Sequence, residues 1–409
     1  MVLSLGVTTA CSKADTADKV LRVAYGSGGS DAQAVWDEVA TAFKANNPGW
    51  DVQFQVQNDD LYETIGLKNL LTSGNPPDVY FEWAGARLQN KLADGYAADI
   101  TDAVSSSGLG AEFNDGAFAA TTIDGKIRMV PYTSDVTNVI WYNKDIFAKV
   151  GITAAPTTWA QMLDDCKKLK AAGITPFSIG NKDLWVAGNW FGHLYSRVAG
   201  DALYDQVLSK QKPMNSPEFV KALQYVADLH AAGYINASAN SITDNEGYSL
   251  FFQNKAAMLP IGSWIISNQI KDAPNMNMSW FNLPAIDGGA GDQGSIMAVT
   301  TGYIVNAKSA KQDKAVDFLK SAFSADMVAK WSAAGITPVA KAGDSAMMDL
   351  LSKSMVDLLN SGARIVAPPD TGYDLKMADA LNTATSEVLD GVKTPQQALD
   401  DAQTKVSTQ

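Results

Sequence analysis

The sequence predicts an α/β protein with two lobes, and three observations support this prediction. With 409 residues, the chain is too long for a single compact core and suits two lobes of ordinary domain size. Short apolar or alternating segments are repeatedly followed by segments with helical spacing, the order that builds a parallel-rich sheet covered by helices. Hydrophobic residues make up 46% of the chain and charged residues 19%, a globular composition without signs of general disorder.

The N-terminal part shows this alternation directly. Strands are expected at 21–25, 52–56 and 79–83. Between the first two strands, Trp36, Val39 and Phe43 recur at helical spacing, and the turn Asn-Asn-Pro-Gly at 46–49 ends that helix. We therefore expect the first lobe to begin as a strand–helix–strand unit.

The middle of the chain contains clear helix starts. An apolar strand at 139–142 precedes a short helix. Thr158 followed by Gln161 is a capping box, which satisfies free backbone N–H groups at a helix start. Ser216 followed by Pro217 is another start, because proline suits the first helical turn. These signals predict a second α/β unit.

The remaining chain is expected to cross between the lobes. A strand at 256–260 leads to a glycine-rich loop at 287–294, the expected return path to the first lobe. A strand at 303–306 and a helix at 310–323 then belong to that lobe. The domain prediction is a leader and linker at 1–19, a first lobe of 20–132 and 298–334, and a second lobe of 133–297 and 335–409.

The hexapeptide Ala-Ala-Gly-Ile-Thr-Pro occurs twice, at 171–176 and 333–338. A duplication is one interpretation. A shared helix ending is the favoured one, because the glycine can adopt a left-handed conformation, the isoleucine folds back and the proline prevents a further helical turn.

The charge of the chain limits its partners. The formal net charge is −12, which argues against a nucleic-acid partner, since phosphate contacts require an excess of Lys and Arg. It also disfavours anionic ligands as a class. No window approaches the roughly 20 apolar residues of a transmembrane helix.

The N-terminus has the outline of a lipid anchor. Residues 1–10 are uncharged and mostly apolar, and Cys11 follows the small residue Ala10, as at the end of a lipoprotein signal. Residues 12–19 would then form a flexible spacer. The alternative is a disordered N-terminus with an incidental cysteine. Cys166 falls on the apolar face of a helix and is expected to be a buried, inert thiol.

Several segments follow one another in a distinctive order. They are FKANNPGWDVQFQ (43–55), SGNPPDVYFEWAG (73–85), VP, WYNKDIF and PTTW between 130 and 159, LFFQNKAAMLPIGSW (250–264) and ALNTATSEVLDGVKTPQQALDDAQTKV (380–406). This order resembles the extracellular solute-binding proteins of ATP-binding-cassette (ABC) importers, and in particular their carbohydrate-binding, maltose-binding-protein-like branch. The resemblance covers nearly the whole chain.

The resemblance implies both a fold and a role. The implied fold is periplasmic-binding-protein-like, with a mixed or parallel sheet flanked by helices in each lobe and crossover hinge strands between them. The implied role is a monomeric receptor without cofactor, not an enzyme, that captures an oligosaccharide by hinge closure and hands it to ABC permease subunits. With the predicted anchor, the receptor is expected on the extracellular face of the cytoplasmic membrane of a Gram-positive bacterium.

Aromatic residues are the first candidates for a sugar site, since flat rings stack on sugar C–H faces and carboxylates or amides bind hydroxyl groups. Trp264 follows a Gly262-Ser263 turn at a strand end, and the resemblance places the matching Trp in the cleft. Gly262 is also predicted to be a ligand-binding residue. Trp83 and Glu82 end an earlier strand, where alternation lets only one of them face the cleft.

Further candidates come from the second lobe and the crossovers. We favour Trp185 over the nearby Trp190 as a stacking platform. Asp370 matches an aspartate that faces the sugar in the family, with a simple turn-forming role as an equal alternative. Asp135 lies at the predicted crossover, and Asp60 follows the second strand.

Other functions find less support in the sequence. The chain has two histidines, His193 and His230, neither with a partner at metal-ligand spacing. A receptor for a metal or an anion is the first alternative, a glycoside hydrolase the second and a purely structural surface protein the third. No metal site is predicted.

Overall fold

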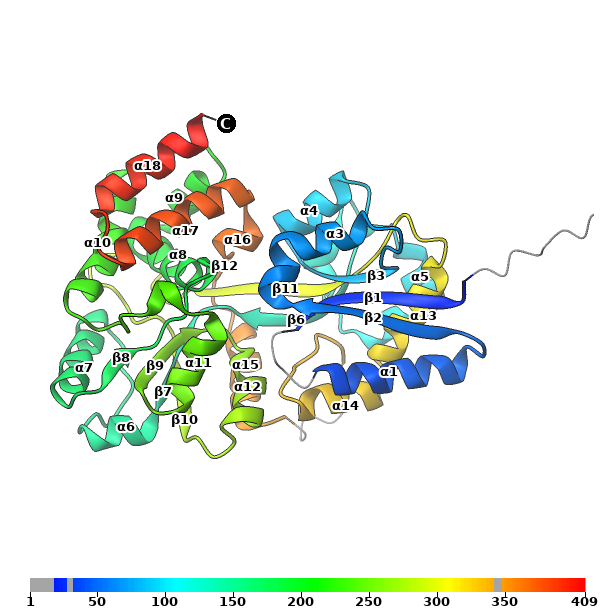
Figure 1. The fold of residues 1–409 in the computed structure, drawn as a ribbon, viewed down its shortest axis with the longest axis horizontal. Helices are drawn as coiled ribbons and strands as arrows, with labels where there is room; N and C mark the ends of the chain where they lie inside the picture. Colours follow the sequence, from blue (N-terminus) through cyan, green and yellow to red (C-terminus); the bar gives the residue numbers. More distant parts are fainter. Residues whose placement is uncertain (1–17, 28–31, 342–347, 409) are drawn as a thin grey trace, which may run out of the picture.

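The computed structural model describes residues 18–27, 32–341 and 348–408; within these ranges the side chain of Asp60 is not described. Cys11, the predicted lipidation site, and the rest of the chain up to residue 17 therefore lie outside the described residues. The described chain forms two bodies joined by long strands (Figure 1).

The elements up to the first crossover alternate as predicted. They are β1 (Val20–Ser27), α1 (Ala32–Asn46), β2 (Asp51–Asn58), α2 (Asp59–Leu61), η1 (Tyr62–Gly66), α3 (Leu67–Leu71), β3 (Val79–Trp83), α4 (Ala86–Ala93), α5 (Thr101–Ser106), η2 (Leu109–Glu112), η3 (Ala119–Thr121), β4 (Thr122–Ile123), β5 (Lys126–Ile127) and β6 (Val130–Val136).

The next elements build most of the second lobe. They are β7 (Val139–Asn143), α6 (Lys144–Lys149), α7 (Trp159–Ala171), β8 (Thr175–Phe177), α8 (Trp185–Ala199), α9 (Asp201–Leu208), α10 (Pro217–Ala231), η4 (Ala239–Ser241), α11 (Asp244–Phe252), β9 (Ala256–Ile261), α12 (Ile265–Asp272) and β10 (Met278–Phe281).

The last elements serve both lobes. They are β11 (Ile296–Val305), α13 (Gln312–Ala322), α14 (Ala325–Ala333), α15 (Leu350–Leu359), β12 (Ile365–Val366), α16 (Pro369–Gly372), α17 (Leu375–Leu389) and α18 (Pro395–Ser407).

Each lobe is organised around its own sheet. The first sheet has the order β12–β11–β3–β1–β2, with β6 also paired to β11. In it, β1 runs parallel to β2 and β3, whereas β11 is antiparallel to β3 and β6. The second sheet has the order β10–β7–β9–β8, with only β8 and β9 parallel. Both sheets are therefore mixed, since β11 and β7 enter them without a crossover helix.

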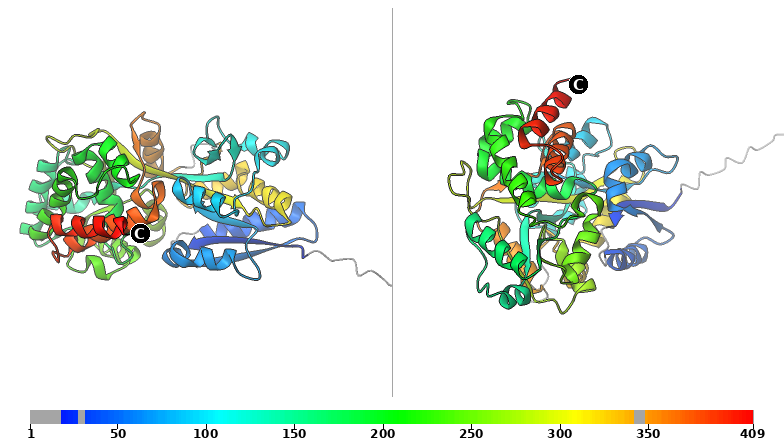
Figure 2. Two further views of the ribbon diagram at one scale, coloured as in Figure 1. Left: turned by 90° about the horizontal axis from the view of Figure 1, so that it is seen from above. Right: turned by 60° about the vertical axis from the view of Figure 1, so that its left-hand side comes forward.

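Two strands connect the lobes and lie next to each other. β6 and β11 form an antiparallel pair, and Figure 2 shows β11 running from one body into the other. Val130 and Tyr303 pack in the core of the first lobe, whereas Val136 and Met297 pack in the core of the second. Each strand thus changes lobes within its own length, so the crossovers lie within β6 and β11.

The chain leaves the first lobe for the last time later than the predicted residue 335. Ile336 still packs against the first-lobe core, and Ala340 belongs to it. Ala340 is held there by a backbone bridge to Phe113, and Pro338 forms a similar bridge to Thr133. The apolar residues after the Gly335 turn fold back onto the lobe that the helix came from.

The local signals read from the sequence occur in the structure. Thr158 and Gln161 form the capping box of α7, and Ser216 caps α10 with Pro217 in its first turn. Both hexapeptides end helices at a left-handed glycine, Gly173 and Gly335, each with φ of +74°. In both, the isoleucine N–H bonds back to a carbonyl five residues earlier, the shared helix ending that we favoured over a duplication.

Among the described residues, none of the helices is long and apolar enough to cross a bilayer. Cys166 is buried, and burial raises the pKa of its thiol, so it is an inert part of the second-lobe core.

Candidate functional site

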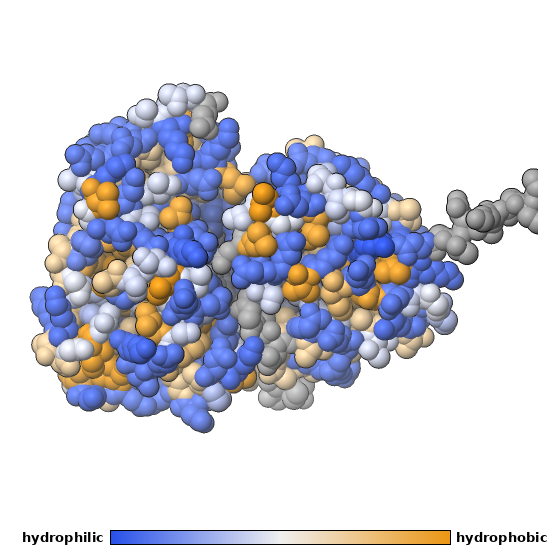
Figure 3. Space-filling model, viewed as in Figure 1, coloured by the Kyte–Doolittle hydropathy of each residue, from blue (hydrophilic) through white to orange (hydrophobic). Residues whose placement is uncertain are grey.

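A cleft lies between the two lobes where the crossover strands connect them. Its walls come from β1, β3 and β6 of the first lobe and from α8, α11, α12, α15 and α16 of the second. The cleft holds about 1500 Å³ of space, open solvent included. The groove is visible between the two halves in Figure 3.

Three of the predicted tryptophans line this cleft. Trp83 reaches it from the first lobe, while Trp185 and Trp264 reach it from the second. The rings of Trp185 and Trp264 have centroids 5.8 Å apart and planes inclined by 53°. All three are only partly buried, so apolar ring faces remain available to a ligand.

The orientation of Trp264 is set by its neighbours. Its indole Nε1–H donates to the Tyr248 hydroxyl at 3.1 Å, and that hydroxyl donates to Asp244 Oδ2 at 2.8 Å. Gly262 is absent from the cleft wall but lies against the ring, because a Cβ at this position would come within 2.0 Å of a Trp264 ring carbon. Gly262, predicted as a ligand residue, is therefore a positioning residue for Trp264.

The choice of Trp185 over Trp190 agrees with their placement. Trp190 is 1% exposed and stacks on Phe191 inside the second-lobe core. Trp185 begins α8 at the cleft. Both lie on one helix, but their separation of five residues places them on different faces.

Glu82 is placed away from the cleft, in contrast to its prediction as a ligand residue. Its carboxylate is buried on the opposite face of β3, where it pairs with Lys91 Nζ at 3.1 Å. Strand alternation explains the difference, since Trp83 takes the cleft side. The Arg87 guanidinium lies 4.9 Å from the centre of the Trp83 ring and supports it from behind.

Asp135 lies at the floor of the cleft on the crossover strand β6. Its carboxylate accepts hydrogen bonds from the hydroxyls of Thr133 and, at 2.8 Å, Ser263. Burial raises the pKa of Asp135, opposed by these two neutral donors. Ser263 comes from the second lobe, so Asp135 links the lobes at their crossover.

Asp370 reaches the cleft from α16 and marks a second link between the lobes. The Arg87 Nε–H donates to the backbone carbonyl of Asp370 at 3.1 Å, and the same guanidinium pairs with Glu63. Burial raises the pKa values of Asp370 and Glu63, and the Arg87 charge opposes both shifts. The side chain of Asp60 is not described, but its neighbour Asp59 lines the cleft.

The ionisable groups that line the cleft are acidic rather than basic. Five carboxylates are among the described lining residues, and no Lys, Arg or His is; the five are Asp59, Glu63, Asp135, Asp244 and Asp370. Hydroxyl and amide side chains provide most of the other polar surface.

Several polar atoms in the cleft wall have no hydrogen-bond partner within the described chain. They are Asp370 Oδ1, Asn189 Oδ1, Thr137 Oγ1 and Thr371 Oγ1, all on side chains that are nine-tenths or more buried. Buried polar groups without partners are costly and rare in proteins. Contacts within the described chain therefore leave these four atoms without hydrogen bonds.

Sequence reasoning missed other lining residues, among them Glu63, Asn189, Asp244 and Tyr248. Asn189 could have been predicted from the sequence, because it lies one helical turn after Trp185 and so on the same face of α8. Asp244 and Tyr248 have the same helical spacing on α11, but nothing local in the sequence directs that helix to the cleft.

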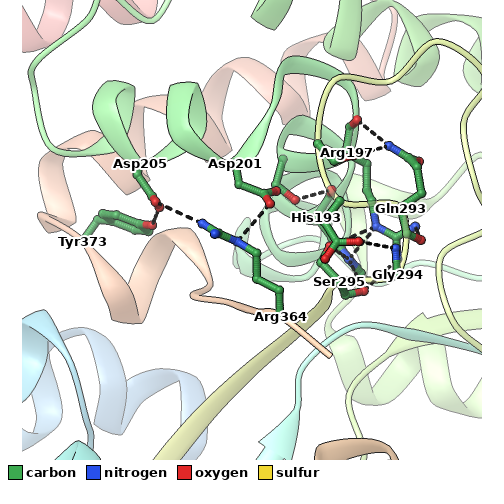
Figure 4. Close-up of polar contacts among 12 residues, drawn as sticks. His193, Arg197, Asp201, Asp205, Gln293, Gly294, Ser295, Arg364 and Tyr373 are labelled. Carbon is green, nitrogen blue, oxygen red and sulfur yellow. Dashed lines mark hydrogen bonds and ion pairs between the residues drawn. The ribbon is translucent and has the colours of Figure 1, made fainter. Parts of the chain in front are cut away.

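Behind the cleft, a buried polar cluster holds the second-lobe ends of the crossover strands (Figure 4). We call His193, Arg197 and Ser295 the hinge base. Arg197 is fully buried and donates to the carbonyls of Leu283 at 3.1 Å, Ser295 at 2.7 Å and Gln293. The glycine-rich loop at 287–294 is thereby fastened to α8, directly before β11.

His193 joins the hinge base to the other crossover. Asn138, between β6 and β7, has its amide nitrogen 3.2 Å from His193 Nδ1, and His193 Nε2 lies 3.2 Å from the Ser295 carbonyl and 3.3 Å from Arg197 Nε. Burial and the Arg197 charge lower the pKa of His193 well below its usual value, so the ring is neutral. Among the described residues, no group of three or more His, Cys, Asp or Glu side chains is arranged to hold a metal ion.

Comparisons with known proteins find similarity to bacterial solute-binding proteins. Residues 26–329 match the family model described as bacterial extracellular solute-binding protein. A binding protein of Brucella abortus is 26% identical over 413 aligned positions, covering 99% of this chain and 96% of the relative. The sn-glycerol-3-phosphate-binding periplasmic protein UgpB of Yersinia enterocolitica is 26% identical over 302 positions, covering 68% of this chain and 66% of the relative.

The solved structure of a chitin oligosaccharide binding protein superposes on this chain with a TM-score of 0.85. The two are 23% identical, and the alignment covers 95% of this chain and 98% of that protein.

Proposed function

The chain belongs to the bacterial extracellular solute-binding proteins, and from that membership we propose that it captures an oligosaccharide by closure of its two lobes and delivers it to the permease of an ABC transporter. The observation that carries the sugar assignment is the composition of the cleft. Tryptophan rings from both lobes face a space whose wall combines apolar side chains with hydroxyl, amide and carboxylate groups. Rings of this kind stack on sugars, and the polar groups bind their hydroxyls.

The proposed contacts divide between the lobes. Trp83 belongs to the first lobe, and Trp185 and Trp264 to the second, so a ligand that touches all three favours the closed arrangement. Asp135 and Asp370 lie where the lobes meet and would bind hydroxyl groups between them. We assign the motion to β6 and β11, where the described chain passes between the lobes, and to residues 333–338.

The remaining features of the proposal follow from the sequence. We propose that the receptor acts as a monomer, is held by lipid on Cys11 at the outer face of the membrane and performs no catalysis. A phosphorylated solute is disfavoured, because no Lys, Arg or His is among the described residues of the cleft wall.

Calorimetric titration of the purified protein with a panel of oligosaccharides tests the proposal. We expect one glycan class to bind and to be recovered at its original length after prolonged incubation. Trp264→Ala should weaken that binding by about 30-fold or more, the size of a hot-spot loss of about 2 kcal/mol.

Trp280→Ala is the matched control, because Trp280 lies in the same lobe, outside the cleft wall, with its indole bonded to Ser354. Binding of a phosphate ester or a metal salt in place of every sugar would overturn the proposal. Shortened glycans would instead support the hydrolase alternative.

A further inference from the structure

The charge of the cleft narrows the class of ligand further. We propose that the captured glycan carries a basic nitrogen, as an amino sugar does, and that the cleft binds it in its cationic form. This inference rests on the proposed function, since it concerns the same site.

Buried acidic side chains inside the cleft differ from those elsewhere in the charge of their partners. Buried acids elsewhere have basic partners: Glu82 pairs with Lys91 at 3.1 Å, and Asp165 pairs with Lys168 at 2.9 Å. In the cleft, the hydrogen bonds found for Asp135 and Asp244 come from neutral hydroxyl, amide and backbone groups. Burying a charge without an opposite charge is costly, so these positions are suited to a cation brought by the ligand.

Among the described residues, the basic group close to these acids is Arg87, and it already has partners. Arg87 stands behind the Trp83 ring, pairs with Glu63 and donates to the Asp370 backbone. The acidic side chains of the cleft wall, among them Glu63, Asp135, Asp244 and Asp370, therefore outnumber this one guanidinium group. The cleft keeps a negative potential, which attracts cations and repels anions.

An independent argument comes from the unpartnered atoms. Asp370 Oδ1 and Asn189 Oδ1 have no hydrogen-bond partner, line the cleft and sit on side chains that are 9% and 6% exposed. A carboxylate or amide oxygen accepts hydrogen bonds only, so both positions require donors from the ligand. An ammonium group offers three donors and no acceptor, which matches this requirement better than a hydroxyl group does.

The aromatic rings agree with a cationic ligand. Trp264 is fixed through Tyr248 to Asp244, so a ring face and a carboxylate lie at one corner of the cleft. A cation is attracted by the faces of Trp and Tyr rings as well as by the carboxylate. The many hydroxyl and amide groups of the wall point to a polyhydroxylated ligand rather than a simple amine.

Linkage-matched pairs of oligosaccharides provide the test. Each pair differs only in an amino group in place of a hydroxyl: β-1,4-linked glucosamine and glucose oligomers of equal length, and maltotriose with its 6-amino-6-deoxy derivative. In the pair that binds, the amino member should bind at least about 10-fold more tightly, a difference of about 1.4 kcal/mol. Equal or tighter binding of the neutral member would overturn this inference and leave the sugar receptor intact. Failure of every sugar, in these pairs and in the wider panel, would overturn the proposed function itself.

Carboxylate variants show where the preference arises. In Asp244→Asn and Asp370→Asn, the preference for the amino member should fall toward unity while the neutral member still binds. Asp326→Asn is the control, because Asp326 lies on α14 outside the cleft wall and is largely exposed. A preference that survives in both cleft variants, with circular dichroism showing folded protein, would contradict a role for these acids.

Discussion

The cleft wall and the hinge base both contain buried polar groups, but these groups differ in whether they have hydrogen-bond partners. In the hinge base, Arg197 donates to three backbone carbonyls and both nitrogens of His193 have partners. In the cleft, acceptor atoms such as Asp370 Oδ1 have none, and the acids outnumber nearby cations. A saturated buried network stabilises one structure, whereas an unsaturated one is completed by a ligand.

The largest expected effect is a loss of stability when the hinge base is disrupted. Arg197→Met should lower the free energy of unfolding by about 3–5 kcal/mol, because several buried carbonyls lose their donor. Arg364→Met is the control: Arg364 appears beside the cluster in Figure 4, but its side chain is 50% exposed and its ion pair with Asp201 should contribute less than about 1 kcal/mol. Urea denaturation compares the two variants. Equal losses would contradict the central position given to Arg197.

Two tryptophans on α8 allow the contribution of the core to stability to be distinguished from the contribution of the cleft to binding. Trp190→Leu should cost about 2–3 kcal/mol of stability, since it leaves a cavity in the second-lobe core, and should change ligand affinity little in the folded fraction. Trp185→Leu should do the reverse, with a small stability change and a clear loss of affinity. Thermal unfolding measures the stability of both variants, and calorimetry measures their ligand affinity. A loss of affinity in Trp190→Leu alone would reverse our assignment.

Acidification should weaken the hinge base through His193. Its pKa in the folded protein lies well below the 6.5 of an unperturbed histidine, so the unfolded chain takes up a proton that the native state excludes. Stability from this residue is present above about pH 6.5 and is lost as the pH falls below it, by at most about 1.4 kcal/mol per pH unit.

The variant His193→Gln should therefore show a flatter decline of stability below about pH 6.5. An unchanged slope in His193→Gln would show that the ring is not held neutral.

The smallest expected effect is a gain of stability in the cleft. The folded-state pKa of Asp370 is raised, so stability from its protonated form is present below the usual aspartate range and is lost as the pH rises through the folded pKa. Asp370→Asn cannot ionise and should be more stable than the parent by about 1 kcal/mol at neutral pH, while binding its glycan less well. Melting temperatures of ligand-free protein at pH 4 and pH 7 would measure this, and a variant that is less stable at pH 7 would contradict it.

The sequence predicted the parts of the cleft that depend on local pattern. Trp264 follows a strand and a tight turn, Trp83 ends an alternating strand, and both line the cleft. Glu82 shows where such reasoning stops, because alternation restricts the cleft to one of two neighbours without saying which. The structure resolves that choice through Lys91, which pairs with Glu82 on the other face of the strand.

What the sequence determined by itself is set by short-range forces: the helix starts at Thr158 and Ser216, the glycine helix endings, the alternation of strands and helices, and the order of segments typical of the family. What only the tertiary structure decided involves residues far apart in the chain. Asp135 meets Ser263 across 128 positions, and Arg87 meets Asp370 across 283. The sequence carries no periodic signal for such pairs, because lobe packing brings them together, and the acidic, cation-poor wall of the cleft follows from that packing.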